Sequence, residues 1–294
     1  MHNQDAGAPV SGQQVLSIVR RALKEDLPWG DITTEALVPA EACSRGLFIV
    51  KNDGVVCGLA VVGAVFRELD PSLVFQARVD DGQQVVRGDV IAEVQGRTRP
   101  ILAGERTALN MLQRMSGIAT ETARYVAAVS GSGATIVDTR KTAPGLRFLD
   151  KYAVRCGGGS NHRFCLSDGV LVKDNHLAAL GERSGEALTS VLQAARSSMP
   201  HTTRLEVEVD RLDQIASALA GGADIILLDN MGPEQLRQAV ELIAGRALTE
   251  ASGGVTLESV AEIAGSGVDL ISVGALTHSV KALDVGLDLV AAPW

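Results

Sequence analysis

Basic side chains concentrate between residues 138 and 174 and give this chain its clearest capacity for chemistry. Seven Lys or Arg residues stand there against four Asp residues, a net charge of +3 in a protein whose formal net charge is −8. An Arg guanidinium binds a carboxylate or phosphate through two parallel hydrogen bonds, and Lys adds a compact positive charge. The cluster predicts a local site for an anionic ligand. The rest of the chain is acidic, which argues against a protein that binds nucleic acid or anionic membranes, because such a protein would carry a broad basic surface.

Several of these polar residues directly follow apolar runs that predict buried strands. The runs are 135–137 and 170–172, and the residues that follow them are Thr139, Arg140, Lys141 and Lys173. Parallel α/β folds place their active sites at such strand ends. We therefore expect these side chains to contact the ligand, with Asp138 holding Arg140 or Lys141 in position.

A glycine-rich loop precedes another candidate pair, His162 and Arg163. A lone His is more often structural, but its basic neighbours favour a hydrogen-bond donor to a carboxylate. Arg147, Lys151 and Arg155 recur at fourfold spacing, as on one helix face. These three are as compatible with a solvated face or structural ion pairs as with ligand contacts.

Acidic residues form a second group of candidates. Glu206, Glu208 and Asp210 alternate along a predicted strand, so their carboxylates face one side of it. Unpaired acids in a barrel interior are costly, so cations, a divalent metal or ligand hydroxyl groups are expected beside them. Mg²⁺ binds a few carboxylates together with substrate phosphate oxygens. We therefore predict Glu208 and Asp229 as magnesium residues, directly or indirectly.

Two further strand ends carry small residues. Ser252, Gly253 and Gly254 precede a predicted helix, and Gly274 and Ala275 follow the next strand. Late loops of this kind bind phosphate through backbone N–H groups in α/β barrels. The pattern is weak by itself, because many such loops are plain turns.

A parallel sheet is the element that must position these residues. Six β-rich runs end in the polar groups described above, at 135–137, 170–172, 205–209, 225–228, 247–251 and 270–273. Helix-like stretches separate the last four runs at 212–220, 233–244 and 257–264, which gives the βα period of a parallel sheet or barrel. The preceding part differs: a helical repeat at 13–25, short strands between 45 and 98, and a long helix at 105–129 that ends at Gly131.

This pattern predicts a division of the chain into a tail, two domains and a closing segment. The expected bounds are a mobile tail at 1–12, an N-terminal α/β domain at 13–130, a barrel domain at 131–276, and a segment at 277–294 that returns to the N-terminal domain. The chain has 294 residues, of which 46% are hydrophobic, enough for one large domain or two ordinary ones. No secretory signal or membrane-length apolar run is present in the sequence.

The four cysteines show no CxxC pair and no Cys/His spacing typical of zinc. We therefore expect reduced thiols in the cytoplasm, without a metal cage or a disulfide framework. No nucleophile-elbow or Cys-His signature is present either, so nothing in the sequence demands a nucleophilic side chain.

Taken together, several motifs resemble quinolinate phosphoribosyltransferase, also called nicotinate-nucleotide pyrophosphorylase (carboxylating). They are ERTALNMLQRMSGIAT, DTRKTAPGLRFLDKYAVRCGGGSNHR, DGVLVKDNH, EVEVD, ILLDNM, ASGGV and ISVGALTHS, and EDLPWGDITT is similar too, so the likeness covers nearly the whole chain. The sequence departs from the family pattern at Ser160 and at Phe164–Ser167, which affects the expected pocket shape but removes no charged role.

The resemblance implies an N-terminal open α/β sandwich followed by an incomplete, six-stranded α/β barrel. It implies a pentosyltransferase of NAD biosynthesis that converts quinolinate and phosphoribosyl pyrophosphate to nicotinate mononucleotide, pyrophosphate and CO₂, with Mg²⁺ and no organic cofactor. It also implies a homodimer or a larger assembly of dimers, in which Arg106 reaches quinolinate in the neighbouring subunit.

The same resemblance implies a role for each candidate residue. Quinolinate would be bound by Arg140, Lys141, His162, Arg163 and Lys173, with Thr139 beside them at the strand tip. Lys141 and Lys173 would stabilise charge during decarboxylation. Glu208 and Asp229 would meet the ribose and Mg²⁺, and the phosphates would lie against Ser252, Gly253, Gly254, Gly274 and Ala275.

Three alternatives remain open at this stage. A phosphoribosyltransferase-like protein linked to molybdate transport and a nicotinate phosphoribosyltransferase share much of this pattern, although the full set of cations favours a ligand with two carboxylates. The segment from Asp80 to Val94 also resembles a lipoyl or biotinyl carrier sandwich. A carrier needs a Lys at a hairpin tip, and residues 74–100 contain none.

Overall fold

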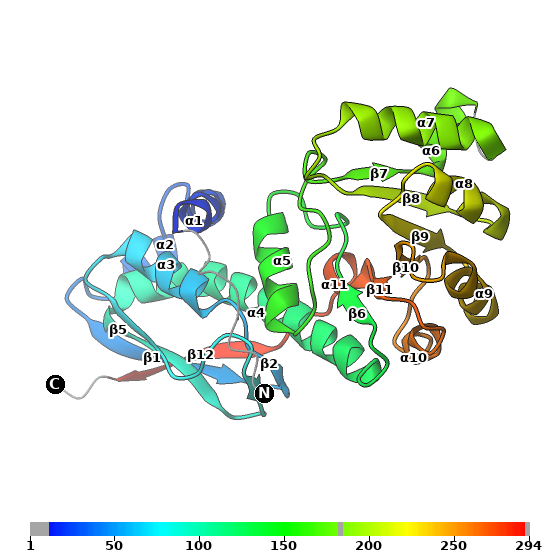
Figure 1. Cartoon of the computed structure of the whole chain (residues 1–294). Coiled ribbons are helices and arrows are strands. Elements are labelled where there is room, and N and C mark those ends of the chain that lie inside the picture. The colour runs from blue at the N-terminus through cyan, green and yellow to red at the C-terminus, as the bar shows by residue number, and fades with distance from the viewer. Residues whose placement is uncertain (1–11, 182–184, 292–294) are drawn as a thin grey trace. The chain divides into compact units, whose positions relative to one another are not determined.

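The computed structural model describes residues 12–181 and 185–291, and the expected tail at 1–12 lies almost entirely outside them. The chain divides into two compact units (Figure 1). The first contains the described residues up to Ala123 together with 142–158 and those from Leu276 onward, and the second contains 124–141 and 159–275. The first unit thus includes residues 142–158, which the sequence-based division assigned to the barrel domain.

An antiparallel sheet with strand order β12-β1-β5-β3 forms the centre of the first unit. Its strands are β1 (Cys43–Val50), β3 (Val74–Ala77), β5 (Val90–Arg97) and β12 (Val285–Ala291), and a small pair is formed by β2 (Gly54–Val55) and β4 (Gln84–Val85). β12 pairs with β1 in antiparallel register, so the end of the described chain returns to the sheet near its start.

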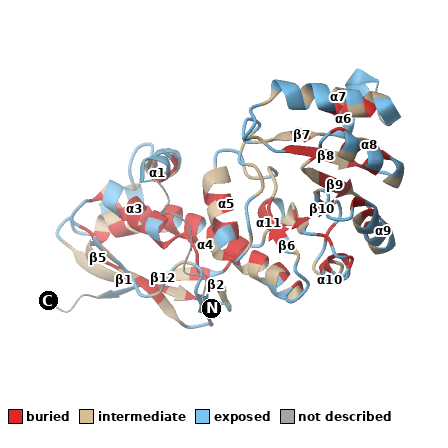
Figure 2. Ribbon diagram, viewed as in Figure 1, coloured by how far each residue is buried: buried red, intermediate tan, exposed pale blue. Residues whose placement is uncertain are grey.

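The core of the first unit lies between this sheet and α3 (Leu59–Leu69), against which α1 (Gly12–Asp26) packs. Phe48 of β1 and Phe66 of α3 are fully buried and meet edge to face, with ring centroids 6.0 Å apart. Phe75 of β3 completes this aromatic group. In Figure 2 the buried residues run along α3 and the facing strands, as expected for one apolar helix face covering a sheet.

Helices α4 (Thr98–Ala128) and α5 (Arg147–Cys156) complete the first unit and lead toward the second. The helix expected at 105–129 begins seven residues earlier, at Thr98. Pro100 does not prevent this, because a first-turn residue needs no N–H bond within the helix. The short helix α2 (Ile32–Leu37) forms after the helix expected at 13–25, and Asp31 caps it by accepting a bond from Thr34 N at 3.0 Å.

The second unit contains a parallel six-stranded sheet with the order β6-β11-β10-β9-β8-β7. The strands are β6 (Thr135–Val137), β7 (Val170–Val172), β8 (Leu205–Val209), β9 (Ile225–Asp229), β10 (Leu248–Ser252) and β11 (Leu270–Ser272). They match the six expected runs to within one residue at each end. β6 and β7 are the two edges and do not pair with each other, so the sheet is an incomplete barrel.

Helices between the strands cover the outer face of this sheet (Figure 1). They are α6 (Asp174–Leu180), α7 (Gly185–Ser198), α8 (Ile215–Ala220) preceded by the short η1 (Leu212–Gln214), α9 (Pro233–Ile243) and α10 (Val260–Ala264), and α11 (Ala275–His278) follows β11. The α6–α7 region carried no sequence-based assignment.

Strand β8 shows how the sheet separates apolar from acidic side chains. Leu205, Val207 and Val209 are buried, and Glu206 and Glu208 alternate with them on the opposite side. Because all six strands are parallel, their carboxyl ends meet at one edge. The polar residues that follow them are thereby brought together.

Candidate active site

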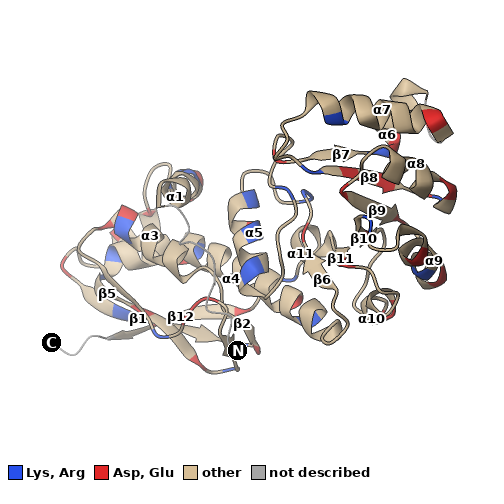
Figure 3. Cartoon of the chain, in the orientation of Figure 1, with Lys and Arg blue, Asp and Glu red and all other residues tan. Residues whose placement is uncertain are grey.

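A cavity of about 590 Å³ lies at the carboxyl ends of the parallel strands. It is lined by Thr139, Arg140, Lys141, His162, Arg163, Leu171, Lys173, Glu208, Leu227, Asp229, Asn230, Glu250, Ser252, Gly253, Gly254 and Ser272, all in the second unit. Eleven of the fourteen residues expected at the site therefore surround one cavity. In Figure 3 basic and acidic residues both occur around these strand ends.

Three of the expected residues do not line this cavity. Arg106 lies exposed on α4 in the first unit. Gly274 and Ala275 follow β11, but the cavity wall at that strand is Ser272 instead. The helical trio also lies elsewhere, because Arg147 donates to Thr142, Lys151 is buried, and Arg155 stacks over the Tyr152 ring.

Two guanidinium groups give one part of the cavity its positive charge. Burial, together with repulsion from the Arg140 cation, lowers the pKa of Arg163 below its ordinary value. Arg163 is held by a bond from its Nη1 to the Gly169 carbonyl oxygen at 3.0 Å. Two cations kept close in a half-buried site are stabilised by an anion between them, so this part of the cavity fits a carboxylate or phosphate.

Asp138 holds the loop at 160–163 in place at the cavity. It is fully buried, and its carboxylate accepts bonds from Asn161 Nδ2 at 2.7 Å and from the His162 backbone N at 2.8 Å. Ser160 forms a bridge with Val137 at the end of β6. These contacts show Asp138 holding the loop that carries His162 and Arg163, and its expected action on Arg140 or Lys141 stays a prediction.

His162 lies against two buried carboxylates. Its Nδ1 accepts a bond from Arg163 N at 2.7 Å, which leaves Nε2 to carry the proton, 3.2 Å from Glu206 Oε2 and 3.6 Å from Glu250 Oε1. Burial and the Glu206 charge raise the pKa of Glu250 from 4.5 to about 7. Within the described residues Glu250 Oε1 has no hydrogen-bond partner. Glu250 therefore takes up a proton readily near neutral pH.

The acidic part of the cavity lies at the ends of β8 and β9. Glu208 Oε2 accepts an ion-pair bond from Lys173 Nζ at 2.8 Å, and Asp229 Oδ2 accepts a bond from Asn230 Nδ2 at 2.6 Å. Burial and the Glu208 charge raise the pKa of Asp229. Two carboxylates that repel each other in this way favour a cationic ligand. Asp210, the third acid of the alternating set, is exposed and 3.9 Å from Arg211.

The loop after β10 brings bare backbone to the cavity. Gly253 has φ 97° and Gly254 has φ 58°, a region that glycine enters without strain. A Cβ atom on Gly253 would collide with the side chain of Asn230, whereas one on Gly254 would meet nothing. Glycine at 253 is therefore needed both for its conformation and for its close approach to the end of β9.

Two groups of side chains in the described part of the chain are close enough to hold a metal ion. One is His162, Glu206 and Glu250, and the other is Cys57, Asp81 and Cys156 in the first unit. Neither is the expected pair Glu208 and Asp229, whose role as magnesium residues stays a prediction.

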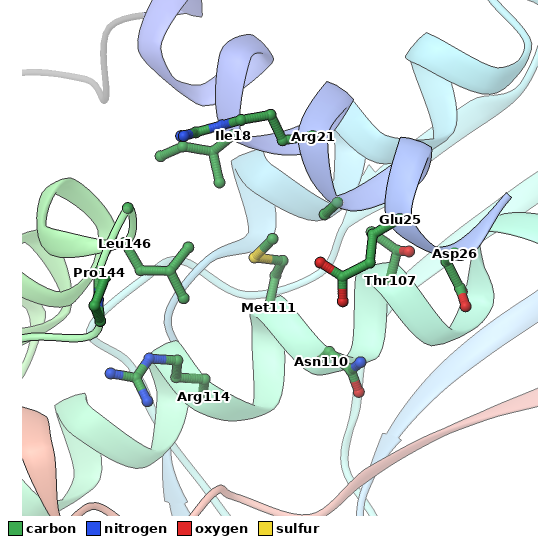
Figure 4. A pocket seen from close by; sticks show the side chains of 12 residues that line it. Ile18, Arg21, Glu25, Asp26, Thr107, Asn110, Met111, Arg114, Pro144 and Leu146 are labelled. Atoms are coloured by element: carbon green, nitrogen blue, oxygen red, sulfur yellow. The ribbon is translucent and has the colours of Figure 1, made fainter. Parts of the chain in front are cut away.

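A second hollow, of about 500 Å³, lies in the first unit between α1, α4 and residues 144–146 (Figure 4). Its lining mixes apolar residues such as Met111 with Arg21, Glu25 and Arg114. Arg114 is already bound to Asp150 through bonds of 2.9 and 2.8 Å. This hollow has fewer charged side chains than the cavity at the strand ends and contains none of the fourteen residues expected at the site, so we assign the candidate active site to the cavity of the second unit.

Sequence reasoning missed three polar residues of the cavity wall: Asn230, Glu250 and Ser272. Asn230 has a detectable signal in the sequence, since it directly follows Asp229, a predicted site residue; in the structure it adopts a positive φ of 55°. Glu250 and Ser272 lie within strands, and their alternation with buried neighbours is the only sequence signal that they face the interior.

Comparison with known proteins gives one family. The model of the quinolinate phosphoribosyl transferase C-terminal domain matches residues 118–288, and that of the N-terminal domain matches residues 31–116. The nicotinate-nucleotide pyrophosphorylase (carboxylating) of Mycobacterium leprae is 48% identical over 278 residues, covering 92% of this chain and 95% of that protein. Quinolinate phosphoribosyltransferase (decarboxylating) 1b of Nicotiana tabacum is 44% identical, covering 92% and 81%.

Solved structures agree with the sequence relatives. The crystal structure of NadC from Streptococcus pyogenes has a TM-score of 0.92 and 40% identity, covering 98% of this chain and all of that one. The nicotinate-nucleotide pyrophosphorylase from Francisella tularensis has a TM-score of 0.89 and 36% identity. Within residues 12–181 and 185–291, no helix has the length and apolar composition needed to cross a membrane.

Proposed function

The chain belongs to the quinolinate phosphoribosyltransferase family, and we propose that it binds its two substrates in the cavity at the carboxyl ends of β6 to β11. The enzyme is a pentosyltransferase of NAD biosynthesis: it converts quinolinate and phosphoribosyl pyrophosphate to nicotinate mononucleotide, pyrophosphate and CO₂. The molybdate-transport-linked protein, the nicotinate phosphoribosyltransferase and the carrier are not favoured.

The observation that carries the assignment of the cavity is its separation of charge. Arg140 and Arg163 lie in one part of it, and Glu208 and Asp229 in another. Quinolinate brings two carboxylates, which need cations. The ribose of the other substrate develops positive charge at its anomeric carbon as pyrophosphate leaves, which calls for carboxylates nearby.

At the basic part, Arg140 and Arg163 bind the quinolinate carboxylates by charge-assisted hydrogen bonds. His162, Thr139, Lys141 and Lys173 complete the surroundings of the ring. This orientation directs the pyridine nitrogen toward the ribose. The nucleophile belongs to the substrate, so positioning and electrostatics account for the catalysis expected of these side chains.

At the acidic part, Glu208 and Asp229 would face the ribose and would hold Mg²⁺, directly or through water. The raised pKa of Asp229 beside the Glu208 charge supports this, because a divalent cation relieves the repulsion. When bound, Mg²⁺ would neutralise diphosphate charge. The loop of Ser252, Gly253 and Gly254 offers backbone N–H groups to phosphate, with Gly274 and Ala275 farther along the same edge.

The chemistry then has two steps. The ring nitrogen forms a bond to the anomeric carbon as the bond to pyrophosphate breaks, which gives quinolinate ribonucleotide. The bond from ring carbon 2 to its carboxylate then breaks, CO₂ leaves, and a proton replaces it. The positive ring nitrogen stabilises the intermediate carbanion, and Lys141 and Lys173 stabilise the charges around it.

Assembly and location complete the proposal. The active form is a homodimer, or an assembly of dimers, in which Arg106 of each subunit contributes to its neighbour's site. The exposed position of Arg106 on α4 leaves it accessible for this role. The protein works in the cytoplasm, consistent with four cysteines that form no disulfide.

One assay tests the proposed function. The protein is incubated with quinolinate, phosphoribosyl pyrophosphate and Mg²⁺, and CO₂ and nicotinate mononucleotide are measured. Both products should appear in equal amounts. Parallel reactions contain nicotinate in place of quinolinate, or lack Mg²⁺, and both should release little pyrophosphate. Turnover of nicotinate at the quinolinate rate would refute the dicarboxylate assignment.

A further inference from the structure

Two cysteines far apart in the sequence meet in the first unit, away from the candidate active site. Cys57 lies between β2 and α3, and Cys156 is the last residue of α5. Their sulfur atoms and a carboxylate oxygen of Asp81 all lie within 4.8 Å of one another. Cys57 is fully buried, whereas Cys156 is partly exposed. The proposed reaction uses neither thiol.

The local backbone also brings the two cysteines together. Gly82 N donates to the Val56 carbonyl oxygen at 2.8 Å, next to Cys57 in the chain. A Cβ atom on Gly82 would lie 3.2 Å from the Cys156 carbonyl oxygen. The turn at Gly82 thus touches the chain beside both cysteines, which keeps α5 close to the segment before α3.

Asp81 decides between a metal site and a thiol pair. One of its oxygens accepts bonds from Gly58 N at 2.9 Å and Leu59 N at 3.1 Å, at the start of α3. The other accepts a bond from Tyr152 Oη at 2.9 Å. Both oxygens are therefore engaged in holding α3 and α5. Without a free carboxylate the two thiols are a poor metal cage, and their reactivity toward each other becomes the relevant property.

The environments of the two thiols differ in the way a redox pair requires. The hydrogen bond with Cys57 lowers the pKa of Cys156, with further help from Tyr152 and Arg155. Burial raises the pKa of Cys57 well above its ordinary value. The thiolate is the reactive form of cysteine. Cys156, which is partly exposed, is therefore the more reactive of the two, and buried Cys57 stays protonated until it reacts with oxidised Cys156.

We propose that Cys57 and Cys156 are a peroxide-sensitive thiol pair that forms a reversible disulfide within the first unit. The Cys156 thiolate attacks one oxygen of hydrogen peroxide, the O–O bond breaks, and the products are a sulfenic acid and hydroxide, which takes up a proton to become water. Cys57 sulfur then attacks Cys156 sulfur, the S–O bond breaks, and the hydroxyl group leaves as water with the Cys57 proton. Two thiols are oxidised, and one peroxide is reduced to two waters.

The disulfide has a consequence for catalysis, and this part rests on the proposed function. A disulfide requires the two sulfurs to approach to about 2.05 Å, so the end of α5 or the segment before α3 must adjust. Gly157 directly follows Cys156 and packs tightly on α4, since a Cβ atom there would collide with the Ala119 carbonyl oxygen and would lie 2.6 Å from Thr122 Cβ. The chain then continues through two more glycines to the loop that carries His162 and Arg163. We expect oxidation to disturb that loop and slow turnover on the order of 10- to 100-fold.

The chemical test uses the full chain with Cys43→Ser and Cys165→Ser, so that only the pair remains. Hydrogen peroxide should remove two hydrogen masses from the intact protein, and peptide mapping without reductant should show the Cys57–Cys156 link. Dithiothreitol should reverse both changes. The matched variants add Cys57→Ser or Cys156→Ser to this background. The first should accumulate a sulfenic acid on Cys156 that dimedone traps, and the second should leave buried Cys57 unmodified.

Three results would overturn the pair. Both thiols could remain open to alkylation after peroxide, the link could form only between molecules, or the untreated protein could carry a stoichiometric metal that both Cys→Ser variants lose. Turnover of quinolinate is read on the same samples and should fall with oxidation and return with reductant. The Cys57→Ser variant cannot form the disulfide, so it should keep its turnover after peroxide. A disulfide without loss of turnover would overturn the regulatory consequence alone. Absence of turnover before peroxide would instead refute the proposed function and leave the thiol result standing.

Discussion

At the residue scale, the two positively charged guanidinium groups of the cavity repel each other, and a dianionic substrate between them would reduce this repulsion. Arg163 carries the evidence, because burial and Arg140 both lower its pKa. A group that is destabilised in the empty site gains interaction energy when an opposite charge enters. This is the property expected of a residue that recognises a carboxylate, rather than of a surface cation already balanced by a neighbour.

Replacing Arg163 with alanine should weaken quinolinate binding more than catalysis of bound substrate. Loss of a charge-assisted hydrogen bond of about 1.5–3 kcal/mol should raise KM for quinolinate on the order of 10- to 100-fold. Steady-state kinetics with quinolinate varied will measure this, with KM for phosphoribosyl pyrophosphate nearly unchanged. Arg237→Ala is the control, because it removes a positive charge from an exposed ion pair with Glu234. Equal effects of the two variants would show that net charge alone matters.

Glu250 gives the site a pH-dependent stability. Its pKa in the folded chain is about 7, against 4.5 in the unfolded chain, so the folded state binds the proton more tightly. The stabilisation is fully present below pH 4.5 and is lost as the pH rises through about 7, by at most about 1.4 kcal/mol per pH unit. Glu250→Gln cannot ionise, so its free energy of unfolding should fall less over this window.

Urea unfolding at a series of pH values measures that difference. Glu234→Gln is the matched control, because Glu234 is exposed and its pKa is lowered by Arg237. The control should keep the wild-type loss of stability with rising pH. If Glu250→Gln followed the wild-type curve as well, a different group would be responsible for the pH dependence.

Glu250 also marks the limit of sequence reasoning about the site. Charged residues at strand ends could be recognised because turn and strand patterns reveal where each strand stops. Glu250 lies inside β10, and its contact with His162 arises only when β6 joins the same sheet and brings the loop at 160–163 to it. The position of a residue along a strand can be predicted from its neighbours in the sequence. The contact of Glu250 with His162, which is 88 residues away, depends on how the strands are arranged in the fold.

At the element scale, the loop after β10 depends on two glycines with different requirements. Both have positive φ, so alanine at either position costs roughly 1–2 kcal/mol in backbone strain. Gly253→Ala adds a collision with Asn230 that Gly254→Ala does not. We predict that Gly253→Ala lowers the melting temperature further and raises KM for phosphoribosyl pyrophosphate more than Gly254→Ala. Thermal unfolding and kinetics check this, and indistinguishable variants would mean that the loop moves aside at no cost.

The elements themselves were predictable to different degrees, for physical reasons. All six parallel strands are short apolar runs between polar turns, and their positions follow from that contrast. The start of α4 could not be predicted in this way, because proline usually indicates the end of a helix, although Pro100 is tolerated in the first turn. The α6–α7 region is mostly exposed, with few buried positions such as Leu188 and Leu192 to mark a periodic face.

At the scale of the whole molecule, pairing between chain ends is the least visible feature of the sequence. β12 pairs with β1 across more than two hundred residues, from Val50↔Val285 to Ser44↔Ala291. Gly46, opposite Leu289 in this ladder, lies so close to Leu287 that a side chain there would displace it. The first unit is thus completed only when the barrel has been synthesised, which ties the two halves of the chain into one protein.

The proposed role of Arg106 would extend that dependence to a second copy of the chain. If each subunit supplies Arg106 to its neighbour, the two arginines of one site come from different subunits. Arg163→Ala removes the arginine of the subunit that contains the cavity, and Arg106→Ala removes the arginine that its neighbour contributes. Each variant alone should be nearly inactive at low quinolinate. Mixed after dissociation and reassembly, half of the dimers are mixed, and each mixed dimer contains one site with both arginines and one with neither. Activity should therefore recover to roughly a quarter of wild type.

Size-exclusion chromatography verifies that each sample is dimeric before and after mixing, and the mixed sample is assayed against the two unmixed variants. Mixing Arg163→Ala with Arg140→Ala is the control, because both of these residues belong to one subunit's cavity and no mixed dimer can contain an intact site. Recovery in the first mixture and not in the second requires a shared site, since only an arginine that crosses between subunits can restore a cavity that already holds the other. Failure of both mixtures in a verified dimer would show that Arg106 is not supplied to the neighbouring subunit, and any loss of activity in Arg106→Ala would then arise within its own subunit.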